Sequence, residues 1–277
     1  MRNWIIGLLL IFSIQIYAQD SKSLIILHLN DTHSRIEPVS SSDYKNPNTG
    51  GVARLDAYVE EVRKENDAVL LFHCGDIVQG TPYFNLFKGQ AEIEFMNFTR
   101  YDASCLGNHE FDCGLEILKE IVDAAKFPFI TTNYDFSETI LAGLTKEYVI
   151  FENEGLKVGV IGLGINPEGL IALVNYEGMK YLDPIESANK AAAYLKEQEG
   201  CDLIVCLSHL GYYQGEEKLG DITLAKKSRN IDIILGGHTH TFFNEPIYVT
   251  NLDGKEVVIN QTGEKGINVG RLDITLN

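Results

Sequence analysis

Short apolar runs alternate with amphipathic stretches along most of this chain, and that alternation restricts its fold more than any other feature. Eight runs rich in β-branched and other apolar residues have the length of strands: 24–29, 68–73, 102–107, 127–133, 148–153, 157–164, 202–209 and 232–237. Five stretches between them have the apolar spacing of helices: 52–65, 83–97, 114–126, 184–199 and 216–228. This pattern predicts an α/β protein, in which a mixed sheet or two stacked sheets are covered by helices.

The C-terminal part of the chain departs from this alternation. Residues 246–261 have the pattern of two strands joined by a tight turn at Asp253-Gly254, and residues 266–277 have the pattern of another strand. Residues 39–51 are rich in Ser, Asn, Gly and Pro, which predicts a loop. Because this loop follows the first group of polar residues described below, we expect it to form part of the rim of a site.

The N-terminus has the features of a secretory signal peptide. Arg2 provides a basic flank, residues 4–17 form a mostly apolar run, and Ala18 is a suitable cleavage point. The run is too short to span a bilayer comfortably, so we predict a cleaved signal peptide over residues 1–18 and no stable membrane anchor. Residues 19–277 would then form one large domain that is exported, to the periplasm or outside the cell. The 45% of hydrophobic residues is enough for a core of that size.

The net charge excludes one class of partner. The 277 residues have a formal net charge of −16, and removal of Arg2 with the signal peptide would make the charge more negative by one. Duplex nucleic acid would be repelled at long range, so we predict no nucleic-acid partner. A small phosphorylated substrate can still bind if the site holds a strong local cation, because salt screens charges that lie more than about 8 Å away.

Several residues that look reactive have simpler interpretations. The chain has five cysteines: Cys74, Cys105, Cys113, Cys201 and Cys206. Their odd number and their positions are not typical of a disulfide framework, so we predict buried free thiols with at most one bridge. Cys113 has no basic partner by spacing, so we interpret it as a packed thiol and not as a nucleophile. His28 and His73 lie inside apolar strands and are interpreted as core residues or as neighbours of a metal site.

Polar side chains with metal-binding or acid–base groups follow five of the predicted strands. They are Asp31, His33, Asp76, Asn108, His109, Asp112, His209, His238 and His240. The carboxyl ends of strands form the ligand sites of open α/β sheets, so we expect these side chains to meet. The chain has seven histidines and five of them belong to this set, which argues against isolated structural roles.

The spacing and chemistry of this set predict a metal centre. Residues i and i+2 of an extended chain point to the same side, so Asp31 and His33 form one ligand pair. His238 and His240 form another for the same reason. Imidazole, carboxylate and amide donors without a thiolate favour Zn²⁺, Mn²⁺, Fe²⁺ or Co²⁺. The predicted ligands are Asp31, His33, Asp76, Asn108, His209, His238 and His240. One ion cannot use them all, so two divalent ions that share the Asp76 carboxylate are expected.

His109 and Asp112 have a different predicted role. In an extended turn the ring of His109 points away from the neighbouring Asn108, and Asp112 is near enough to raise the pKa of His109 and keep it protonated. With Asn108, this imidazolium would bind the substrate phosphate and assist the departure of the leaving oxygen. The expected nucleophile is a metal-bound hydroxide, because the metal lowers the pKa of its water towards neutrality.

The order of the polar motifs resembles that of a known enzyme family. The motifs DTH, GD, GNHE, SH and GGHTH occur in this order, each after a predicted strand, and together resemble the calcineurin-like metallophosphoesterase superfamily. The longer segments NDTH, GGVARL, GDIVQGTP and GNHEFDCG are similar to the catalytic domain of the 5′-nucleotidase family. The match spans the chain from Leu24 to the final strand. Gln79 stands where the purple acid phosphatase branch would have a tyrosine, which disfavours that branch.

The resemblance implies a fold and a ligand assignment. Residues 19–277 would form a metallophosphoesterase catalytic domain of four layers, with two stacked mixed β-sheets flanked by helices. The ligands implied for one ion are Asp31, His33, Asp76 and His240. Those implied for the other are Asp76, Asn108, His209 and His238. The same catalytic pair, His109 and Asp112, is implied.

The resemblance also implies a function and leaves alternatives. It implies hydrolysis of nucleotide phosphate esters, with 5′-nucleoside monophosphates as lead substrates and diphosphosugars, 2′,3′-cyclic nucleotides or thiosulfate esters as further classes. Members usually have a C-terminal domain that binds the base, and no such domain follows the final predicted strand. The chain would act alone, or as the catalytic subunit of a split nucleotidase with a separate C-terminal-domain polypeptide. A non-enzymatic metal-binding scaffold would be expected to lose Asn108 or His109, and both are present.

Overall fold

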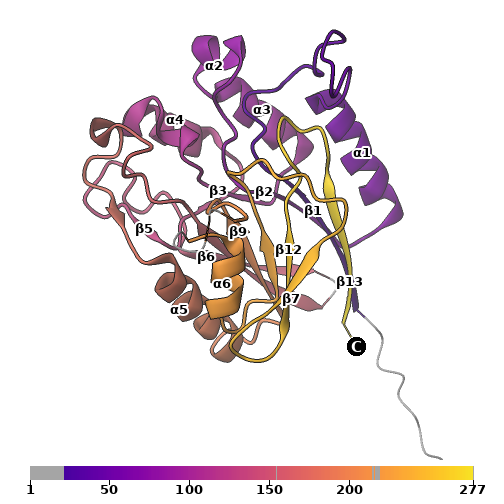
Figure 1. Cartoon of the computed structure of the whole chain (residues 1–277), viewed down its shortest axis with the longest axis vertical. Coiled ribbons are helices and arrows are strands. Elements are labelled where there is room, and N and C mark those ends of the chain that lie inside the picture. The colour runs from indigo at the N-terminus through magenta and orange to yellow at the C-terminus, as the bar shows by residue number, and fades with distance from the viewer. Residues whose placement is uncertain (1–21, 154, 214, 216–218, 277) are drawn as a thin grey trace, which may run out of the picture.

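The apolar runs of the chain form two β-sheets that pack face to face in this computed structural model, which describes residues 22–153, 155–213, 215 and 219–276 (Figure 1). The first sheet has the order β13–β1–β2–β3–β4, with β1 (Lys22–Leu29), β2 (Val69–His73), β3 (Ala103–Cys105), β4 (Phe129–Ile130) and β13 (Gly270–Leu276). The second has the order β11–β12–β10–β9–β7–β6, with β6 (Tyr148–Asn153), β7 (Leu156–Leu163), β9 (Leu203–Ser208), β10 (Ile233–Leu235), β11 (Ile247–Thr250) and β12 (Glu256–Asn260). A separate small sheet pairs β5 (Tyr134–Asp135) with β8 (Lys180–Tyr181).

Both large sheets are mixed, as the sequence predicts. Strand β1 is parallel to β2 and antiparallel to β13, and β9 is parallel to β7 and β10. The edge pairs β6–β7 and β11–β12 are antiparallel. The predicted turn at Asp253-Gly254 does join β11 to β12, with Gly254 at φ +72°. The final strand, β13, follows β12 in the chain but pairs with β1 in the other sheet.

Helices cover the outer face of each sheet, which gives four layers (Figure 1). In β1, Leu24 and Ile26 pack between the two sheets, whereas Ile25 and Leu27 pack towards the helices. The first sheet is covered by α1 (Val52–Glu65), α3 (Gln90–Thr99) and α4 (Gly114–Ala124), with α2 (Pro82–Phe87) preceding α3. The second is covered by α5 (Pro184–Glu197) and α6 (Asp221–Lys227). Burial on both faces explains why the strands are continuously apolar in sequence. The predicted stacked-sheet α/β architecture is confirmed.

Some predicted elements differ in length or number. The single helix predicted over 83–97 is two helices, because Lys88 and Gly89 adopt left-handed φ values of 51° and 94°. A Cβ atom at Gly89 would lie 2.6 Å from Cδ1 of Ile121 on α4, so this close crossing requires glycine. The strand predicted over 127–133 is only two residues long, and α6 begins at Asp221; residues 216–218 of its predicted range lie outside the described residues.

The N-terminal prediction and the cysteine prediction have different outcomes. The signal peptide predicted over residues 1–18 lies outside the described residues. Among the described residues, no helix combines the length and apolar character needed to cross a membrane. All five cysteines are free thiols, and four of them are buried, as predicted.

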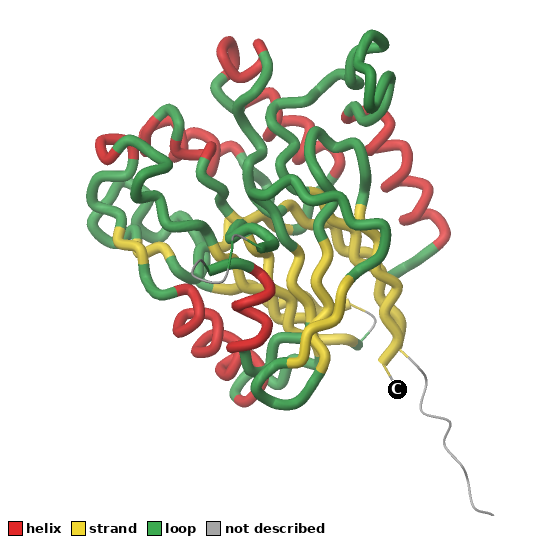
Figure 2. The backbone as a smooth tube through the Cα atoms, in the orientation of Figure 1, coloured by secondary structure: helices red, strands yellow, loops and turns green. Residues whose placement is uncertain are grey.

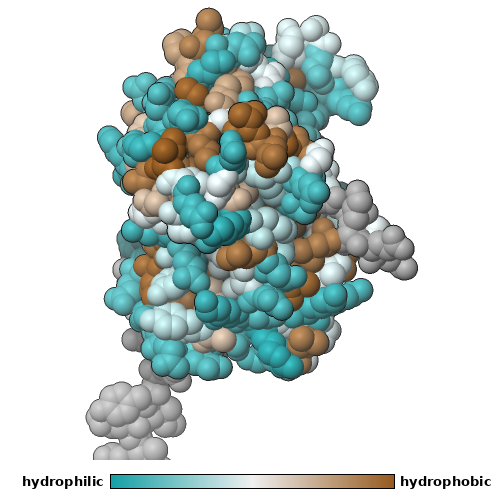
Figure 3. Space-filling view, turned by 90° about the vertical axis from the view of Figure 1, so that its left-hand side faces the viewer, coloured by the Kyte–Doolittle hydropathy of each residue, from teal (hydrophilic) through white to brown (hydrophobic). Residues whose placement is uncertain are grey.

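The segment between β7 and β8 lies on the surface at the left of Figure 1. Within the described residues its regular structure is limited to the short helix η2 (Leu173–Asn175). Leu170, Leu173 and Val174 are 53%, 68% and 75% exposed. Figure 3 faces this side and shows apolar side chains gathered in the upper half among hydrophilic ones. These apolar residues therefore do not contribute to the core.

Candidate metal centre

The five polar motifs meet where the strands of both sheets end. The loops after β1, β2 and β3 come from one sheet, and those after β9 and β10 come from the other. Figure 2 shows these loops gathered above the strands. Because parallel strands end on the same side of a sheet, stacking the two sheets brings both sets of loops together.

The predicted metal ligands of the two sheets lie close to one another. Atom Nε2 of His209 is 3.1 Å from Oδ2 of Asp76. Atom Nε2 of His240 is 3.2 Å from Oδ1 of Asp31 and 3.0 Å from Nε2 of His33. Ligands that follow β1 and β2 therefore face ligands that follow β9 and β10.

The donor atoms form three overlapping groups in which all atoms lie within 4.8 Å of one another. The groups are Asp31, His33 and His240; His33, Asp76 and His109; and Asp76, His209 and His238. Asn108 joins the last group, since its Oδ1 is 3.0 Å from Nδ1 of His238. The structure thus brings together all seven side chains that the sequence singles out as ligands, and Asp76 belongs to two of the groups.

The backbone at these residues is not extended, so the geometric reason given for the ligand pairs is wrong. The φ values are positive at five of the seven: Asp31 (50°), His33 (49°), Asp76 (55°), His238 (69°) and His240 (50°). Left-handed φ costs a non-glycine residue about 1–2 kcal/mol, and such strain concentrates at functional sites. Tertiary hydrogen bonds hold these turns, for example from Asp31 N to Gly75 O at 3.0 Å and from His33 N to Asp76 O at 3.1 Å.

His209 has the surroundings of a ligand that binds through Nε2. The residue is fully buried, and its Nδ1–H donates to the carbonyl of Cys74 at 2.7 Å, which leaves Nε2 directed at the carboxylate of Asp76, 3.1 Å away. A Cβ at Gly237 would lie 2.8 Å from Nδ1, so glycine permits this approach. Burial opposes protonation, but the charges of Asp76 and Asp31 outweigh it and raise the pKa of His209 to about 10. Such a buried, negatively charged cluster of imidazole and carboxylate donors fits divalent ions.

His109 and Asp112 form the predicted pair, although not in an extended turn. His109 begins the 3₁₀ helix η1 (His109–Phe111), which places Asp112 one turn later. Atom Nδ1 of His109 is 2.8 Å from Oδ2 of Asp112, and both side chains are about one third exposed. Burial opposes protonation, but the hydrogen bond to Asp112 and the charge of Asp76 raise the pKa of His109 above its usual value.

Comparison with known proteins identifies the family of this site. Residues 24–242 match the family model described as calcineurin-like phosphoesterase. The chain belongs to this family. The resemblance on which the sequence prediction depends is therefore confirmed.

Relatives of this phosphoesterase include 5′-nucleotidases. A snake venom 5′-nucleotidase from Crotalus adamanteus is 33% identical over 93% of this chain and 46% of its own length. The 5′-nucleotidase of Homo sapiens is 32% identical over 91% and 46%. The structure of a 5′-nucleotidase precursor from Thermus thermophilus matches with a TM-score of 0.82 and 37% identity, over 92% of this chain and 52% of that one. The chain thus spans about half the length of the curated relatives that it matches.

Sequence reasoning missed a carboxylate that holds two loops of the phosphoesterase site together. Glu110 is buried, and it accepts hydrogen bonds from the backbone N–H groups of Asp76 at 3.0 Å, Ile77 at 2.6 Å and Gly107 at 2.6 Å. Burial and the charge of Asp76 raise the pKa of Glu110. Its place inside the GNHE motif, directly after His109, was the available signal.

Two further polar side chains of the site come from the C-terminal tail. Oε2 of Glu264 is 3.1 Å from Nδ1 of His240, and Gln261 donates from Nε2 to the carbonyl of Gly237 at 2.7 Å. The tail was predicted only as strands, and no motif marked these residues. The predicted loop 39–51 is irregular, as expected.

His28 and His73 are core residues of the phosphoesterase, as interpreted. Both are buried, with Nε2 of His73 at 3.0 Å from Oγ1 of Thr32 and Nε2 of His28 at 3.1 Å from Nδ2 of Asn260. Neither hydrogen bond involves a predicted metal ligand.

Proposed function

We propose that this chain is an exported phosphohydrolase of the 5′-nucleotidase type, which uses two divalent metal ions to hydrolyse phosphate esters of nucleotides. The observation that carries the proposal is the meeting of seven ligand side chains from both sheets around Asp76, beside the His109–Asp112 pair. Membership of the calcineurin-like phosphoesterase family and the 5′-nucleotidases among the relatives support it.

The proposed ligand assignment starts from two of the donor groups, the one that contains Asp31 and the one that contains His209. One ion would be held by Asp31, His33, Asp76 and His240. The other would be held by Asp76, Asn108, His209 and His238. Zn²⁺, Mn²⁺, Fe²⁺ and Co²⁺ all suit these donors. When bound, the ions would supply positive charge to the phosphoryl oxygens and lower the pKa of a coordinated water.

The proposed roles of the catalytic pair follow from its hydrogen bond. His109 donates from Nδ1 to Asp112, so the second proton of the imidazolium is carried on Nε2. From there His109 would bind the substrate phosphate together with the Asn108 side chain and give a proton to the leaving oxygen. Asp112 orients the ring and keeps it protonated.

The lead substrates are 5′-nucleoside monophosphates, by analogy with the relatives. One relative is described as a trifunctional nucleotide phosphoesterase from Bacillus subtilis, and one solved structure is an NAD nucleotidase from Haemophilus influenzae. Diphosphosugar and cyclic-nucleotide diesters are therefore alternative substrates. A separate polypeptide that supplies the other half of the relatives' length, as in a split nucleotidase, is the alternative organisation.

The decisive experiment measures phosphate release from AMP by the purified chain from residue 19, with and without each metal. We expect metal-dependent release, and we expect His109→Ala to lower kcat about 100-fold or more while two ions per chain remain bound. Glu120→Ala, an exposed change on α4, is the matched control. If the wild type binds two ions but hydrolyses no phosphate ester, either alone or with the C-terminal half of a relative, the scaffold alternative is correct and the proposal is wrong.

A substrate panel separates the solitary and the split organisations. AMP, a nucleotide diphosphosugar, a 2′,3′-cyclic nucleotide and a simple aryl phosphate are compared with and without a separately produced C-terminal half of a relative. A gain in kcat/KM for nucleotides alone supports the split organisation. Equal rates with and without that half support the solitary one.

We also propose that residues 1–18 direct export and are removed. N-terminal sequencing of the protein isolated from its native location tests this, since a mature chain beginning at Gln19 is expected. A chain that retains Met1 would contradict cleavage.

A further inference from the structure

Asn30, which joins the end of β1 to the proposed ligand Asp31, is a buried amide with a partner for each of its hydrogen-bonding groups. The residue is only 1% exposed. Its Nδ2 donates to Oδ2 of Asp31 at 2.6 Å and to the carbonyl of Gly263 at 2.6 Å. Its Oδ1 accepts from the backbone N–H of Thr262 at 2.8 Å and from the hydroxyl of Thr262 at 2.7 Å. Because a primary amide offers two hydrogens and two lone pairs, Asn30 has no capacity left for other partners.

The partners of this side chain require an amide at position 30. The Asp31 carboxylate and the Gly263 carbonyl are acceptors, whereas Thr262 presents two donors. An aspartate at this position would have no hydrogen for either acceptor, and an aliphatic residue would leave these buried groups unpaired, which is unfavourable. Asn30 therefore makes a directional contact with Asp31 and does not merely fill space.

The two oxygens of the Asp31 carboxylate have different surroundings as a result. Oδ2 lies 2.6 Å from Nδ2 of Asn30 and 2.9 Å from the backbone nitrogen of His238, which is farther from Oδ1, at 3.2 Å. Oδ1 lies 3.2 Å from Nε2 of His240 and 3.9 Å from Nε2 of His209. Oδ1 is thus the oxygen that faces the imidazoles of the site, and Oδ2 is the oxygen that N–H donors hold.

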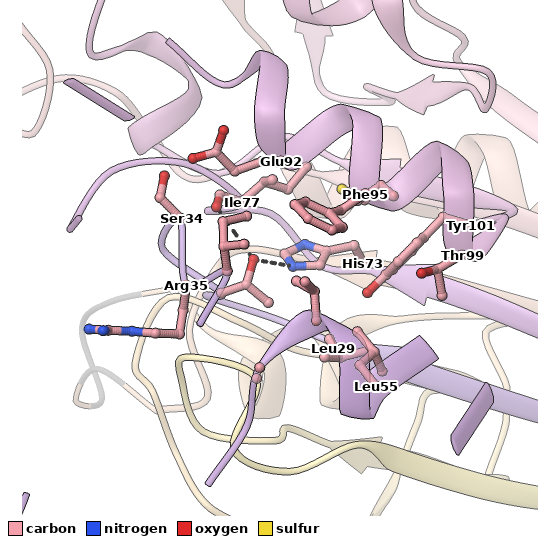
Figure 4. A pocket seen from close by; sticks show the side chains of 16 residues that line it. Leu29, Ser34, Arg35, Leu55, His73, Ile77, Glu92, Phe95, Thr99 and Tyr101 are labelled. Atoms are coloured by element: carbon pink, nitrogen blue, oxygen red, sulfur yellow. Dashed lines mark hydrogen bonds between the residues drawn. The ribbon is translucent and has the colours of Figure 1, made fainter. Parts of the chain in front are cut away.

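The opposite side of the same loop does not orient the Asp31 carboxylate. Figure 4 shows that side, where Ser34 and His73 line a small cavity. Nε2 of His73 lies 3.0 Å from Oγ1 of Thr32 there, so this part of the loop is also held. Neither Asn30 nor Asp31 lines the cavity. The orientation of the carboxylate therefore depends on the side of the loop that Asn30 occupies.

We propose that Asn30 is a positioning residue of the metal centre. Its amide holds Oδ2 of Asp31, so that Oδ1 alone is free for the ion that the proposed function assigns to Asp31. This inference rests on the proposed function, because it presupposes an ion at this centre. Since Thr262 and Gly263 follow β12 of the second sheet, Asn30 also links the orientation of a ligand after β1 to the C-terminal part of the chain.

The test uses Co²⁺ in place of other divalent ions, because the intensity of its visible absorption falls as its coordination number rises. The purified chain and Asn30→Ala are compared at two Co²⁺ ions per chain. In Asn30→Ala the released Oδ2 is expected to join Oδ1 in coordination, so the visible bands should weaken. The affinity for the ion, measured by chelator competition, should fall about 10–100-fold, because the carboxylate is no longer held in place.

Thr262→Val is the matched control, since it removes one hydrogen bond of the same network and leaves the contact between Asn30 and Asp31. We expect a lower Tm and an unchanged Co²⁺ spectrum. Equal spectral changes in both variants, or an unchanged spectrum in Asn30→Ala with Co²⁺ bound, would overturn this inference and leave the proposed function standing. A wild type that binds no Co²⁺ would overturn the metal centre and this inference with it.

Diffraction keeps the proposal testable if Asn30→Ala does not fold. In crystals of the wild type loaded with Zn²⁺, Oδ1 of Asp31 should lie about 2.0–2.2 Å from an ion, and Oδ2 should keep its hydrogen bond to Asn30. Both oxygens at bonding distance from an ion would contradict the proposed role of Asn30.

Discussion

Glu264 is joined to the proposed metal centre through the ring of His240. Its Oε2 is 3.1 Å from Nδ1 of His240, and its Oε1 is 2.7 Å from Nζ of Lys265. An acceptor at Nδ1 fixes the tautomer that presents Nε2 to a metal, so we expect Glu264→Ala to weaken the affinity for the ion held by His240 about 10–100-fold. Chelator competition measures this affinity, with the exposed change Glu256→Ala as control. Unchanged affinity in Glu264→Ala would show that the contact does not orient the ring.

Asp221 is a buried acid whose protonation should affect stability. Burial raises its pKa to about 7, although the hydrogen bond from Ser208 Oγ at 2.6 Å opposes this shift. Since the folded state then holds the proton more tightly than the unfolded state, Asp221 reduces stability as pH rises from about 4 to about 7. Asp221→Asn cannot lose this proton. Its free energy of unfolding, minus that of the wild type, should therefore increase over this range.

Urea denaturation of both proteins at several pH values measures this difference, with Asp123→Asn as the exposed control. A difference between Asp221→Asn and the wild type that stays constant from about pH 4 to about pH 7 would contradict the shifted protonation.

At the scale of single residues, the site shows which of its features a sequence can predict. Asp76 and His209 were recognisable because few other side chains bind metals at strand ends. Their backbone conformation was not predictable, because the left-handed φ of Asp76 depends on hydrogen bonds from loops distant in sequence. Glu110 was missed because its partners are backbone N–H groups, so that its place in the GNHE motif was the only signal in the sequence.

At the scale of elements, the break between α2 and α3 depends on Gly89. Its φ is 94°, and an added Cβ would meet Ile121 at 2.6 Å. We expect Gly89→Ala to lower the free energy of unfolding by about 2–3 kcal/mol, from the strained φ and the overlap together. Gly143→Ala is the matched control, since its φ is 76° with nothing within 4 Å, and it should cost only the backbone part. If chemical denaturation shows equal losses of unfolding free energy in Gly89→Ala and Gly143→Ala, the contact with Ile121 does not explain the need for glycine.

This break also explains why the bounds of some elements were predicted less accurately than those of others. The apolar spacing of residues 83–97 continues across Gly89, so periodicity alone predicts one helix. The two helices differ because α3 must pack against α4, a contact that local sequence does not contain. The strand β4 is shorter than its apolar run for a related reason: beyond Ile130, Thr131 and Thr132 hydrogen-bond to Lys146 and Gly162. Long, strongly patterned strands such as β1 and β7 were predicted within one or two residues.

At the scale of the whole molecule, the layers and the site have one origin. Alternating strands and helices predict sheets covered by helices, and the carboxyl ends of parallel strands predict where ligands gather. The assignment of strands to sheets was not predictable, because β13 follows β12 in the chain but pairs with β1 of the other sheet. The result is that ligands on both sheets face each other across the sheet–sheet boundary.

That arrangement makes the proposed ions a link between the two sheets. Asp31, His33 and Asp76 follow strands of one sheet, whereas His209 and His240 follow strands of the other. The buried carboxylates of Asp31 and Asp76, which follow strands of one sheet, both lie within 4 Å of Nε2 of His209 from the other. An ion present at a thousandfold excess over its Kd stabilises the folded state by about 4 kcal/mol. Removal of both ions should therefore lower Tm by roughly 10 °C or more.

Differential scanning calorimetry before and after chelation measures this change, with elemental analysis of the same samples and restoration by added Zn²⁺ or Mn²⁺ as the control. Tm should fall with the metal content and return with it, because the link between the sheets is restored. If both ions are removed and Tm does not change, the ions do not bridge the sheets. In that case, packing of the inter-sheet core alone, through Phe72, Val160 and Leu207, would determine how the two halves of the site are held.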